Sequence, residues 1–440
     1  MKRLFLLILL ILCGVVIAPQ ATRAQEETHP LLAMLALLPD HDETRAGFLS
    51  YVDYDLITRS RYSVVAPETY TEWEALSGEE GRLWMEAFER VSAGPSTIFE
   101  GLREFGSLPQ IAGFGFFDIQ RGLAYGNPPT HGILVQGDFD RDAVIAAHEA
   151  RGYTTQVEGD NALLLHETGT QPDLDAVERG NIFDPSFGRR PPLVVADDLV
   201  AAIFNPQTAQ AVLETQAGEA PSLLESPDIH ALVEALTDEA FIPGDLVQMV
   251  RFNLADVVNV IDRSNATREE LQAMLEDSNI DPQMAGMMMA MVGDQDVPEW
   301  DNYGTLPLYL GVAFADKQDG ETQVNVIALL YATEEDARTG AEELSRRIAI
   351  YADTIYTRRT DPILDLLSEA EVAEPQVYFH EATGLYVGAA SVRSPLPTPE
   401  GVPMSLTEDQ PPAPGIVLRW WMRGIYQRSF YPLWLLIEEA

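Results

Sequence analysis

The chain has 440 residues, of which 69 are acidic and 28 basic, so its formal net charge at neutral pH is −41. Such an acidic surface repels nucleic acids and anionic lipids, which excludes a nucleic-acid-binding protein. Since 46% of the residues are hydrophobic and Cys13 is the only cysteine, we expect the fold to depend on a hydrophobic core rather than on disulfides.

The first 24 residues have the three parts of a secretory signal peptide. Two basic residues open it, residues 4–18 form an apolar run, and residues 22–24 resemble a cleavage site. The run is shorter than the roughly 20 residues of a membrane span, which favours cleavage over an uncleaved anchor. Lipidation of Cys13 is a third, less favoured alternative, because Leu12 stands where lipoprotein signals place a small residue. We therefore expect an extracytoplasmic protein, secreted or in the cell envelope.

Removal of this segment would strongly change the composition of the chain. It would take away the only cysteine, which excludes thiol nucleophiles, cysteine–zinc sites and iron–sulfur clusters. It would leave 25 basic residues against 69 acidic ones, a net charge of −44, with Lys317 as the only lysine. A GC-rich genome and adaptation to high salt would each explain why the chain is acidic and its basic residues are nearly all arginine, and the sequence does not separate the two causes.

Three strand-to-helix units predict an α+β fold. The first has a strand at 132–136 and a helix at 143–151. The second has a strand hairpin at 193–204 and a helix to residue 216. The third has strands at 308–314 and 323–331 and a helix at 334–351.

The residues at the ends of these elements suit their places. Asn205 is a good N-cap before Pro206, and Thr333 begins a capping box. Asp319-Gly320 between two apolar stretches indicates a tight hairpin.

A weak internal repeat suggests that the chain holds two related lobes of antiparallel sheet with packed helices. The string His-Glu-Thr-Gly at 166–169 resembles His-Glu-Ala-Thr-Gly at 380–384, and each follows a predicted strand. Chance remains an alternative, because the shared string is short. We predict an N-terminal lobe at 25–245 and a C-terminal lobe at 246–394, with a helical insert at 254–291.

Five methionines crowd the helical insert. Thioethers can bind Cu(I), but Met284, Met287, Met288 and Met291 follow the spacing of one buried helix face, which favours a core or a docking surface. A proline-rich linker is predicted at 395–414.

Two groups of acidic residues are candidate sites. Asp138, Asp140, Asp142 and Glu149 match positions of a calcium loop, but Ala143 replaces the turn glycine, which favours a helix N-terminus. Asp53 and Asp55 would share one face of a strand and could serve a carboxylate-based hydrolase. A solvated strand end or a cap of the next helix is the more favoured reading of this pair.

The sequence offers no recognisable catalytic or cofactor motif. His148, His166 and His380 each precede a glutamate, but none belongs to the His-Glu-x-x-His zinc pattern. A nucleophile elbow, a phosphate loop and a dinucleotide-binding turn are absent from the sequence. We therefore predict no cofactor and no metal, and the balance leans away from an enzyme.

The segment 415–440 is predicted to be an amphipathic, aromatic tail. It combines cations with half of the tryptophans, so it could contact a membrane surface or a protein partner, or fold back onto the acidic body. The residues of the possible interface are Arg419, Trp420, Trp421, Arg423 and Trp434.

The strings at 193–199, 205–213 and 220–228 resemble a group of exported bacterial proteins of unknown function, as do 35–40 and 51–54. The resemblance covers about half of the chain and implies export without a defined activity. The leading hypothesis is an exported, non-catalytic protein with a binding or organising role, and an extracytoplasmic carboxylate-based hydrolase is the alternative.

Overall fold

The computed structural model describes most of the chain. The described residues are 29–59, 67–127 (without 79, 82, 83, 85–87 and 89), 131–158, 161–252, 303–351, 362–396 (without 368), 415–426, 430–434 and 437. The signal segment, the methionine-rich insert and the proline-rich linker predicted above therefore lie outside the described residues, apart from the first residues of the linker.

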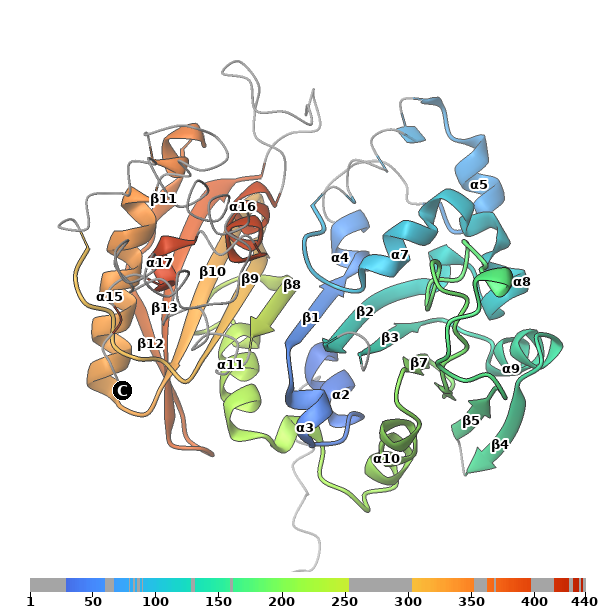
Figure 1. Ribbon diagram of the computed structural model, residues 1–440. Helices are drawn as coiled ribbons and strands as arrows, with labels where there is room; N and C mark the ends of the chain where they lie inside the picture. The colour runs from blue at the N-terminus through green and yellow to red at the C-terminus, as the bar shows by residue number, and fades with distance from the viewer. Residues whose placement is uncertain are drawn as a thin grey trace, which may run out of the picture.

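Thirteen described strands form a single sheet in which all pairings are antiparallel (Figure 1). The strands are β1 (Phe48–Asp53), β2 (Ile119–Gly126), β3 (Gly132–Gly137), β4 (Thr154–Glu158), β5 (Asn161–Leu165), β6 (Leu193–Val195), β7 (Leu199–Ile203), β8 (Asp245–Phe252), β9 (Gly311–Asp319), β10 (Thr322–Tyr331), β11 (Glu371–Val372), β12 (Gln376–His380) and β13 (Leu385–Pro395). Their order is β11-β13-β10-β9-β8-β1-β2-β3-β7-β6-β5-β4, and β12 also pairs with β13.

The sheet consists of two similar halves that meet where β1 pairs with β8. From this junction outward, one half runs β1-β2-β3-β7 and the other runs β8-β9-β10-β13. In each half the second strand of a hairpin, β3 or β10, leads into a helix, α9 (Arg141–Ala150) or α15 (Glu334–Ile350). The predicted α+β class is confirmed, and the two lobes are halves of one continuous sheet. The predicted boundary between residues 245 and 246 falls at the start of β8.

Helices cover both faces of this sheet. On one face lie α2 (Pro30–Ala36), α10 (Pro206–Gln216) and α11 (Pro227–Thr237). The opposite face is covered by two groups: over the N-terminal half α4 (Tyr54–Arg59), α5 (Tyr70–Ala75), α7 (Ser96–Gly101), α8 (Leu108–Ala112) and α9, and over the C-terminal half α15, α16 (Ile416–Tyr426) and α17 (Tyr431–Trp434). Short helical turns complete the set: α3 (Asp42–Arg45), η1 (Leu102–Ser107), η2 (Phe116–Asp118), η3 (Leu174–Ala176), η4 (Leu223–Glu225) and η6 (Ile363–Leu366).

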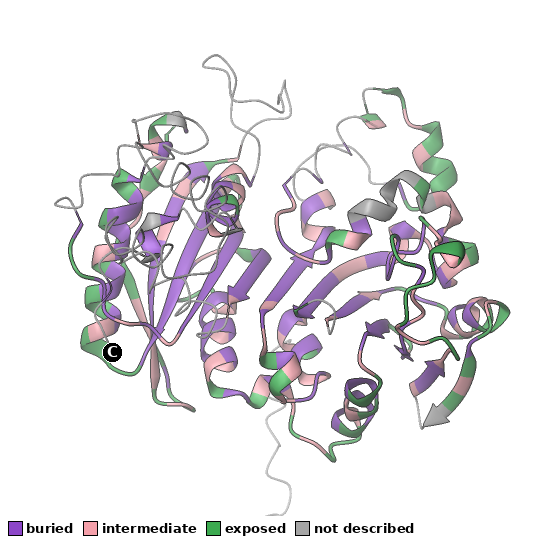
Figure 2. Ribbon diagram, viewed as in Figure 1, coloured by how far each residue is buried: buried purple, intermediate pink, exposed green. Residues whose placement is uncertain are grey.

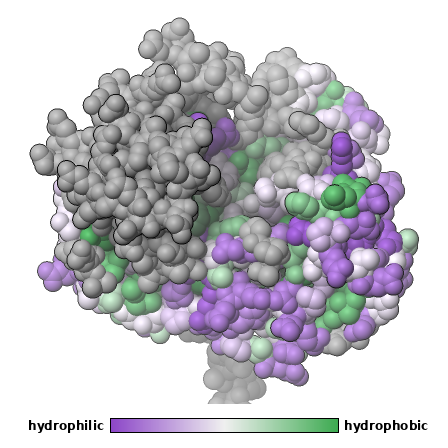
Figure 3. All heavy atoms as spheres, viewed as in Figure 1, coloured by the Kyte–Doolittle hydropathy of each residue, from purple (hydrophilic) through white to green (hydrophobic). Residues whose placement is uncertain are grey.

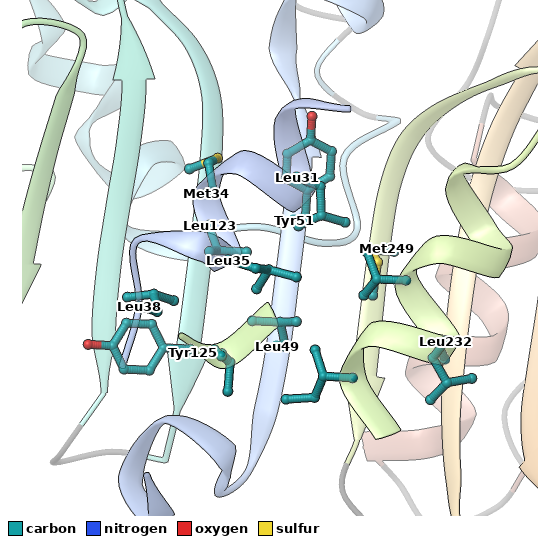
Figure 4. Close-up of a cluster of buried hydrophobic side chains, with 14 of the residues drawn as sticks. Leu31, Met34, Leu35, Leu38, Leu49, Tyr51, Leu123, Tyr125, Leu232 and Met249 are labelled. Carbon is teal, nitrogen blue, oxygen red and sulfur yellow. The ribbon is translucent and has the colours of Figure 1, made fainter. Parts of the chain in front are cut away.

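Alternate side chains along a strand belong to separate hydrophobic cores on the two faces of the sheet. In β10, Val326 and Ala328 face the α11 side, whereas Ile327 and Leu329 face α15 and α16, as the period of two in a strand requires. Figure 2 shows the strands buried and the outer helix surfaces exposed. The core on the α2 and α11 side spans both halves, since Leu35 packs over β1 and β2 while Leu232 of α11 lies beside β9 (Figure 4).

Local sequence signals explain where these elements begin and end. The Asn205 side chain accepts a hydrogen bond from the Gln207 N–H, and Thr333 accepts one from the Asp336 N–H, so both predicted caps are confirmed. Gly320 adopts a φ of 59° in the β9–β10 hairpin.

On the face seen in Figure 3, hydrophilic side chains cover most of the described surface, with apolar ones scattered among them. No helix within the described residues is long and apolar enough to cross a membrane.

Candidate metal centre

Three potential metal ligands from two distant segments converge beside the sheet. His230 and Glu234 lie on α11, and His380 ends β12. One ligand atom from each residue lies within 4.8 Å of the other two, and within the described chain this is the one such group of three histidine or acidic side chains. The candidate centre is defined here as His230, Glu234 and His380.

The distances within the candidate centre are close to those of a metal site. Glu234 Oε2 lies 3.1 Å from His230 Nε2 and 3.1 Å from His380 Nε2. In a tetrahedral zinc site with bonds of about 2.0–2.1 Å, ligand atoms lie about 3.3 Å apart. Two of the three edges, which are hydrogen-bonding contacts in this structure, are therefore close to that length, and the ligand atoms of the two histidines lie within 4.8 Å of each other.

The secondary structure accounts for this convergence. His230 and Glu234 are four residues apart in α11, so their side chains lie one above the other on the same helix face. Tyr378 and His380 are two residues apart in β12 and share the strand face that is turned toward Glu234. The side chain of His380 is 2% exposed, against 29% for His230 and 39% for Glu234, so one side of the centre is open to solvent.

Neighbouring hydroxyl groups orient two of the ligands. The Tyr378 O–H donates to Glu234 Oε1 over 2.7 Å, which leaves Oε2 directed at the two imidazoles. His380 Nδ1 lies 2.7 Å from Thr383 Oγ1. This hydroxyl can donate to Nδ1, or it can accept from a protonated Nδ1 and leave the Nε2 lone pair for a metal. Such outer contacts fix the ring orientation and tautomer of metal-binding histidines.

The electrostatic environment favours the protonation states that a metal needs at His230 and Glu234, whereas His380 Nε2 donates to Glu234 and must give up this hydrogen bond to bind a metal. Burial lowers the pKa of the His230 imidazole, His380 lowers it further, and Glu234 only partly opposes this shift. Burial alone would raise the pKa of the Glu234 carboxyl, but hydrogen bonds from Tyr378 and His380 hold it below its usual value. At neutral pH the centre thus offers a neutral His230 imidazole and an ionised carboxylate, the forms that bind metal.

The donor set selects a class of metal. Imidazole nitrogens suit zinc, copper, iron and nickel, whereas calcium and magnesium prefer all-oxygen sites. Two histidines and one glutamate with an open side match the ligand set of zinc sites that keep one position for water. Zinc is therefore the metal that these residues fit best.

The predicted tail interface is placed partly in the core. Trp420 and Trp421 are 7% and 2% exposed and belong to the same core cluster, in which Trp421 packs with Phe314 and Phe430. Arg419 is half-buried and Arg423 is exposed. Trp434 ends α17, but its side chain lies outside the described part of the chain. In this conformation both described indoles fold back onto the body, and an interface through the tail stays a prediction.

Polar contacts fasten the tail to the body at three points. The Gly415 N–H donates to Gln323 Oε1 over 3.3 Å, and the Tyr309 O–H donates to the Leu433 carbonyl over 3.2 Å. The buried Arg347 guanidinium donates to the Pro432 carbonyl over 3.3 Å. The tail therefore forms part of the folded body in this conformation.

The two acidic groups weighed in the sequence have structural roles. Asp140 caps α9 by accepting from the Asp142 and Ala143 N–H groups, so the favoured helix N-terminus is confirmed over the calcium loop. The expectation that Asp53 and Asp55 share a strand face is wrong, because β1 ends at Asp53 and Asp55 lies in α4. Asp53 accepts from the Leu56 N–H over 2.9 Å and pairs with Arg121 Nε over 2.9 Å, as a helix cap does.

The sequence contained part of the signal for the candidate centre. The search for His-Glu-x-x-His missed it, because here the carboxylate follows His230 by four residues and the second histidine lies in another segment. A search for histidine and carboxylate at i and i+4 on a predicted helix would have found His230 and Glu234. The pairing with His380 depends on how α11 packs against the sheet, and no local pattern reveals it.

The repeated strings fold in a similar way, but they have different surroundings. His166 and His380 each follow or end a strand and contact a threonine hydroxyl, Thr168 at 2.9 Å and Thr383 at 2.7 Å. Gly169 and Gly384 then turn the chain with φ values of 54° and 71°. Only His380 of this pair is in the candidate centre, so His166 offers a matched control.

Comparisons with known proteins give weak similarity only. No protein-family model matches the sequence, and no curated protein matches it significantly. The chain is similar to the solved structure of TP0453 in crystal form III, with 8% identity, a TM-score of 0.30, and coverage of 82% of this chain and 93% of that chain. Crystal form I of TP0453 gives 7% identity, a TM-score of 0.29, and coverage of 82% and 92%. The candidate centre therefore rests on this chain's own residues.

Proposed function

We propose that this protein is an exported, non-catalytic binding protein of the cell envelope or the extracellular space, and that it binds a divalent transition metal, with zinc as the best fit. One observation carries the proposal: His230 Nε2, Glu234 Oε2 and His380 Nε2 point to one small volume, with two of their separations at 3.1 Å. The signal-like segment at 1–24 supports the exported location.

The charge of the chain also supports cation binding. A net charge of −41 creates a negative potential that raises the local concentration of cations near the surface. The same charge binds cations weakly and without specificity, so affinity alone does not identify a site. The test must therefore compare variants that have almost the same net charge.

Calorimetric zinc titration of the mature chain tests the proposal. We expect one tight site per chain in the wild type, and a loss of affinity of about 100-fold or more in His230→Ala and His380→Ala, since each variant removes a direct ligand. His166→Ala is the matched control, because it removes an equivalent turn histidine outside the centre, and it should bind zinc as the wild type does. Equal affinity in all four proteins would overturn the proposal.

The Tyr378→Phe variant provides a finer test of the same centre. It keeps all three ligands but removes the 2.7 Å hydrogen bond that orients Glu234. Loss of such an outer contact typically weakens metal binding about 10–100-fold. We expect an intermediate affinity, and wild-type affinity would show that the carboxylate needs no such support.

A further inference from the structure

The ligands of the candidate centre come from the two halves of the chain. His230 and Glu234 precede β8, which is the first strand of the C-terminal half. His380 follows β10 and α15, so it belongs to the C-terminal half of the sequence. The hydrogen bond between Glu234 and His380 spans 146 residues of sequence. A metal bound by all three residues would therefore cross-link two segments that are joined only through a long stretch of chain.

One of these segments, α11, is held firmly by the sheet. Its buried face includes Leu232 and Leu236, which lie in the large core. At its N-terminal end Asp228 forms an ion pair with Arg251 of β8. At its C-terminal end the buried Lys317 of β9 donates to the Leu236 carbonyl over 2.9 Å, as cations do at helix C-termini. Helix α11 is thus a fixed support for whatever binds to its outer face.

The other segment, β12, is a five-residue edge strand. Among the described strands it pairs only with β13, and its Phe379 side chain is 48% exposed. Its contacts with the α11 region run through Tyr378 and His380, which both reach Glu234, and through the ring of Phe241 at 5.3 Å from Tyr378. Short edge strands with few buried contacts open locally at low cost.

We infer that the metal acts as a clasp that fastens the β12–β13 hairpin to α11, so that metal occupancy controls the order of this edge of the sheet. The inference rests on the proposed function. Without metal, the hydrogen bonds to Glu234 and the ring contacts of Tyr378 with Phe241 and of His380 with His230 hold β12 against α11. With metal, His380 and Glu234 are also joined by coordination bonds, and β12 cannot leave without breaking the centre.

Hydrogen exchange with and without zinc, read by mass spectrometry, tests the clasp. With free zinc at 100 times its dissociation constant, linkage predicts about 100-fold slower exchange of amides that open only when zinc leaves. We expect this slowing in peptides that cover β12 and its turn to β13. Peptides that cover β6 and β7, at the far side of the other half, should exchange as before.

The His230→Ala variant separates the metal from the direct hydrogen bonds. It removes a ligand whose side chain is 29% exposed, together with its ring contact to His380, but keeps the hydrogen bonds of Tyr378 and His380 with Glu234. In this variant, zinc should no longer slow exchange in β12, whereas in His166→Ala it should. If calorimetry shows zinc binding but exchange in β12 does not change, the clasp is overturned and the proposed function stands. If no zinc binds, both are overturned.

Discussion

The guanidinium of Arg90 and the carboxylate of Asp316 form a bidentate ion pair that is fully buried, with Nε–Oδ2 and Nη2–Oδ1 distances of 2.7 and 2.8 Å. Gln248 and Gln323 also donate to this carboxylate, so its charge is surrounded by donors. The pair joins the segment that precedes α7 in the N-terminal half to β9 of the C-terminal half.

Breaking the buried pair should be costly. In Asp316→Asn the Arg90 charge stays buried without its partner, which typically costs about 3–5 kcal/mol. Asp319→Asn is the control, because its pair with Arg393 is partly exposed to solvent and should contribute about 0–1 kcal/mol. Urea unfolding measures both. Similar losses in the two variants would show that the buried pair has no special role.

The packing of Trp421 predicts a structural role for the tail. Its replacement by alanine leaves a cavity in the core and should lower the free energy of unfolding by about 3–5 kcal/mol. Leu174→Ala is the control at a side chain that is 71% exposed, with an expected change within about 0.5 kcal/mol.

Truncation after residue 414 separates the structural tail from the tail as an interface. If the tail is part of the core, removing α16 and α17 should destabilise the body, as judged by its thermal unfolding. If the truncated protein keeps its full stability but loses binding to vesicles or to a partner, the tail is an interface instead.

The buried His148 predicts acid sensitivity. Burial, together with Arg151 and Arg190, lowers the pKa of His148 to about 3 from an ordinary value of 6.5. Below pH 6.5 the His148 imidazole is therefore protonated in the unfolded chain but stays neutral in the folded one. The free energy of unfolding then falls as the pH drops from about 6.5 toward 3, by up to about 1.4 kcal/mol per pH unit. His148→Leu should lack this contribution. Parallel stability curves for the two proteins between pH 7 and 4 would contradict the prediction.

The single lysine beyond the signal segment predicts a simple labelling pattern. Lys317 is fully buried, and burial lowers its pKa to about 8. If the signal segment is removed as proposed, an amine-reactive ester should label the native protein only at its amino terminus, and Lys317 should react only after denaturation. Intact mass should place that terminus at Gln25. A labelled Lys2 in the native protein would show that the signal segment is retained.

Much of the fold could be predicted because its signals are local. Asn205, Thr333 and Asp140 act within three residues of their own position, and the hairpin at Gly320 needs only the conformation of its own turn. These residues give the same result in almost any tertiary context. The strand-to-helix units therefore appear in the structure close to where the sequence indicated them.

The rest depends on contacts between distant residues. The pairing of β1 with β8 makes the sheet continuous, and the sequence of neither strand identifies the strand with which it pairs. Asp53 and Asp55 were assigned to one strand because alternation does not show where the chain turns into α4. The meeting of Glu234 with His380 follows from the position of α11 on the sheet, which the sequence of α11 alone does not specify.

X-ray absorption at the zinc edge of the zinc-loaded wild-type protein tests the metal centre most directly. We predict one zinc per chain with two imidazole nitrogens and carboxylate or water oxygens, at zinc–nitrogen distances of about 2.0–2.1 Å. The two-imidazole signal should persist in His166→Ala and be absent in His230→Ala, in which zinc should no longer be held at this centre. A spectrum with oxygen ligands only would mean that zinc binds the acidic surface, and it would contradict the central claim.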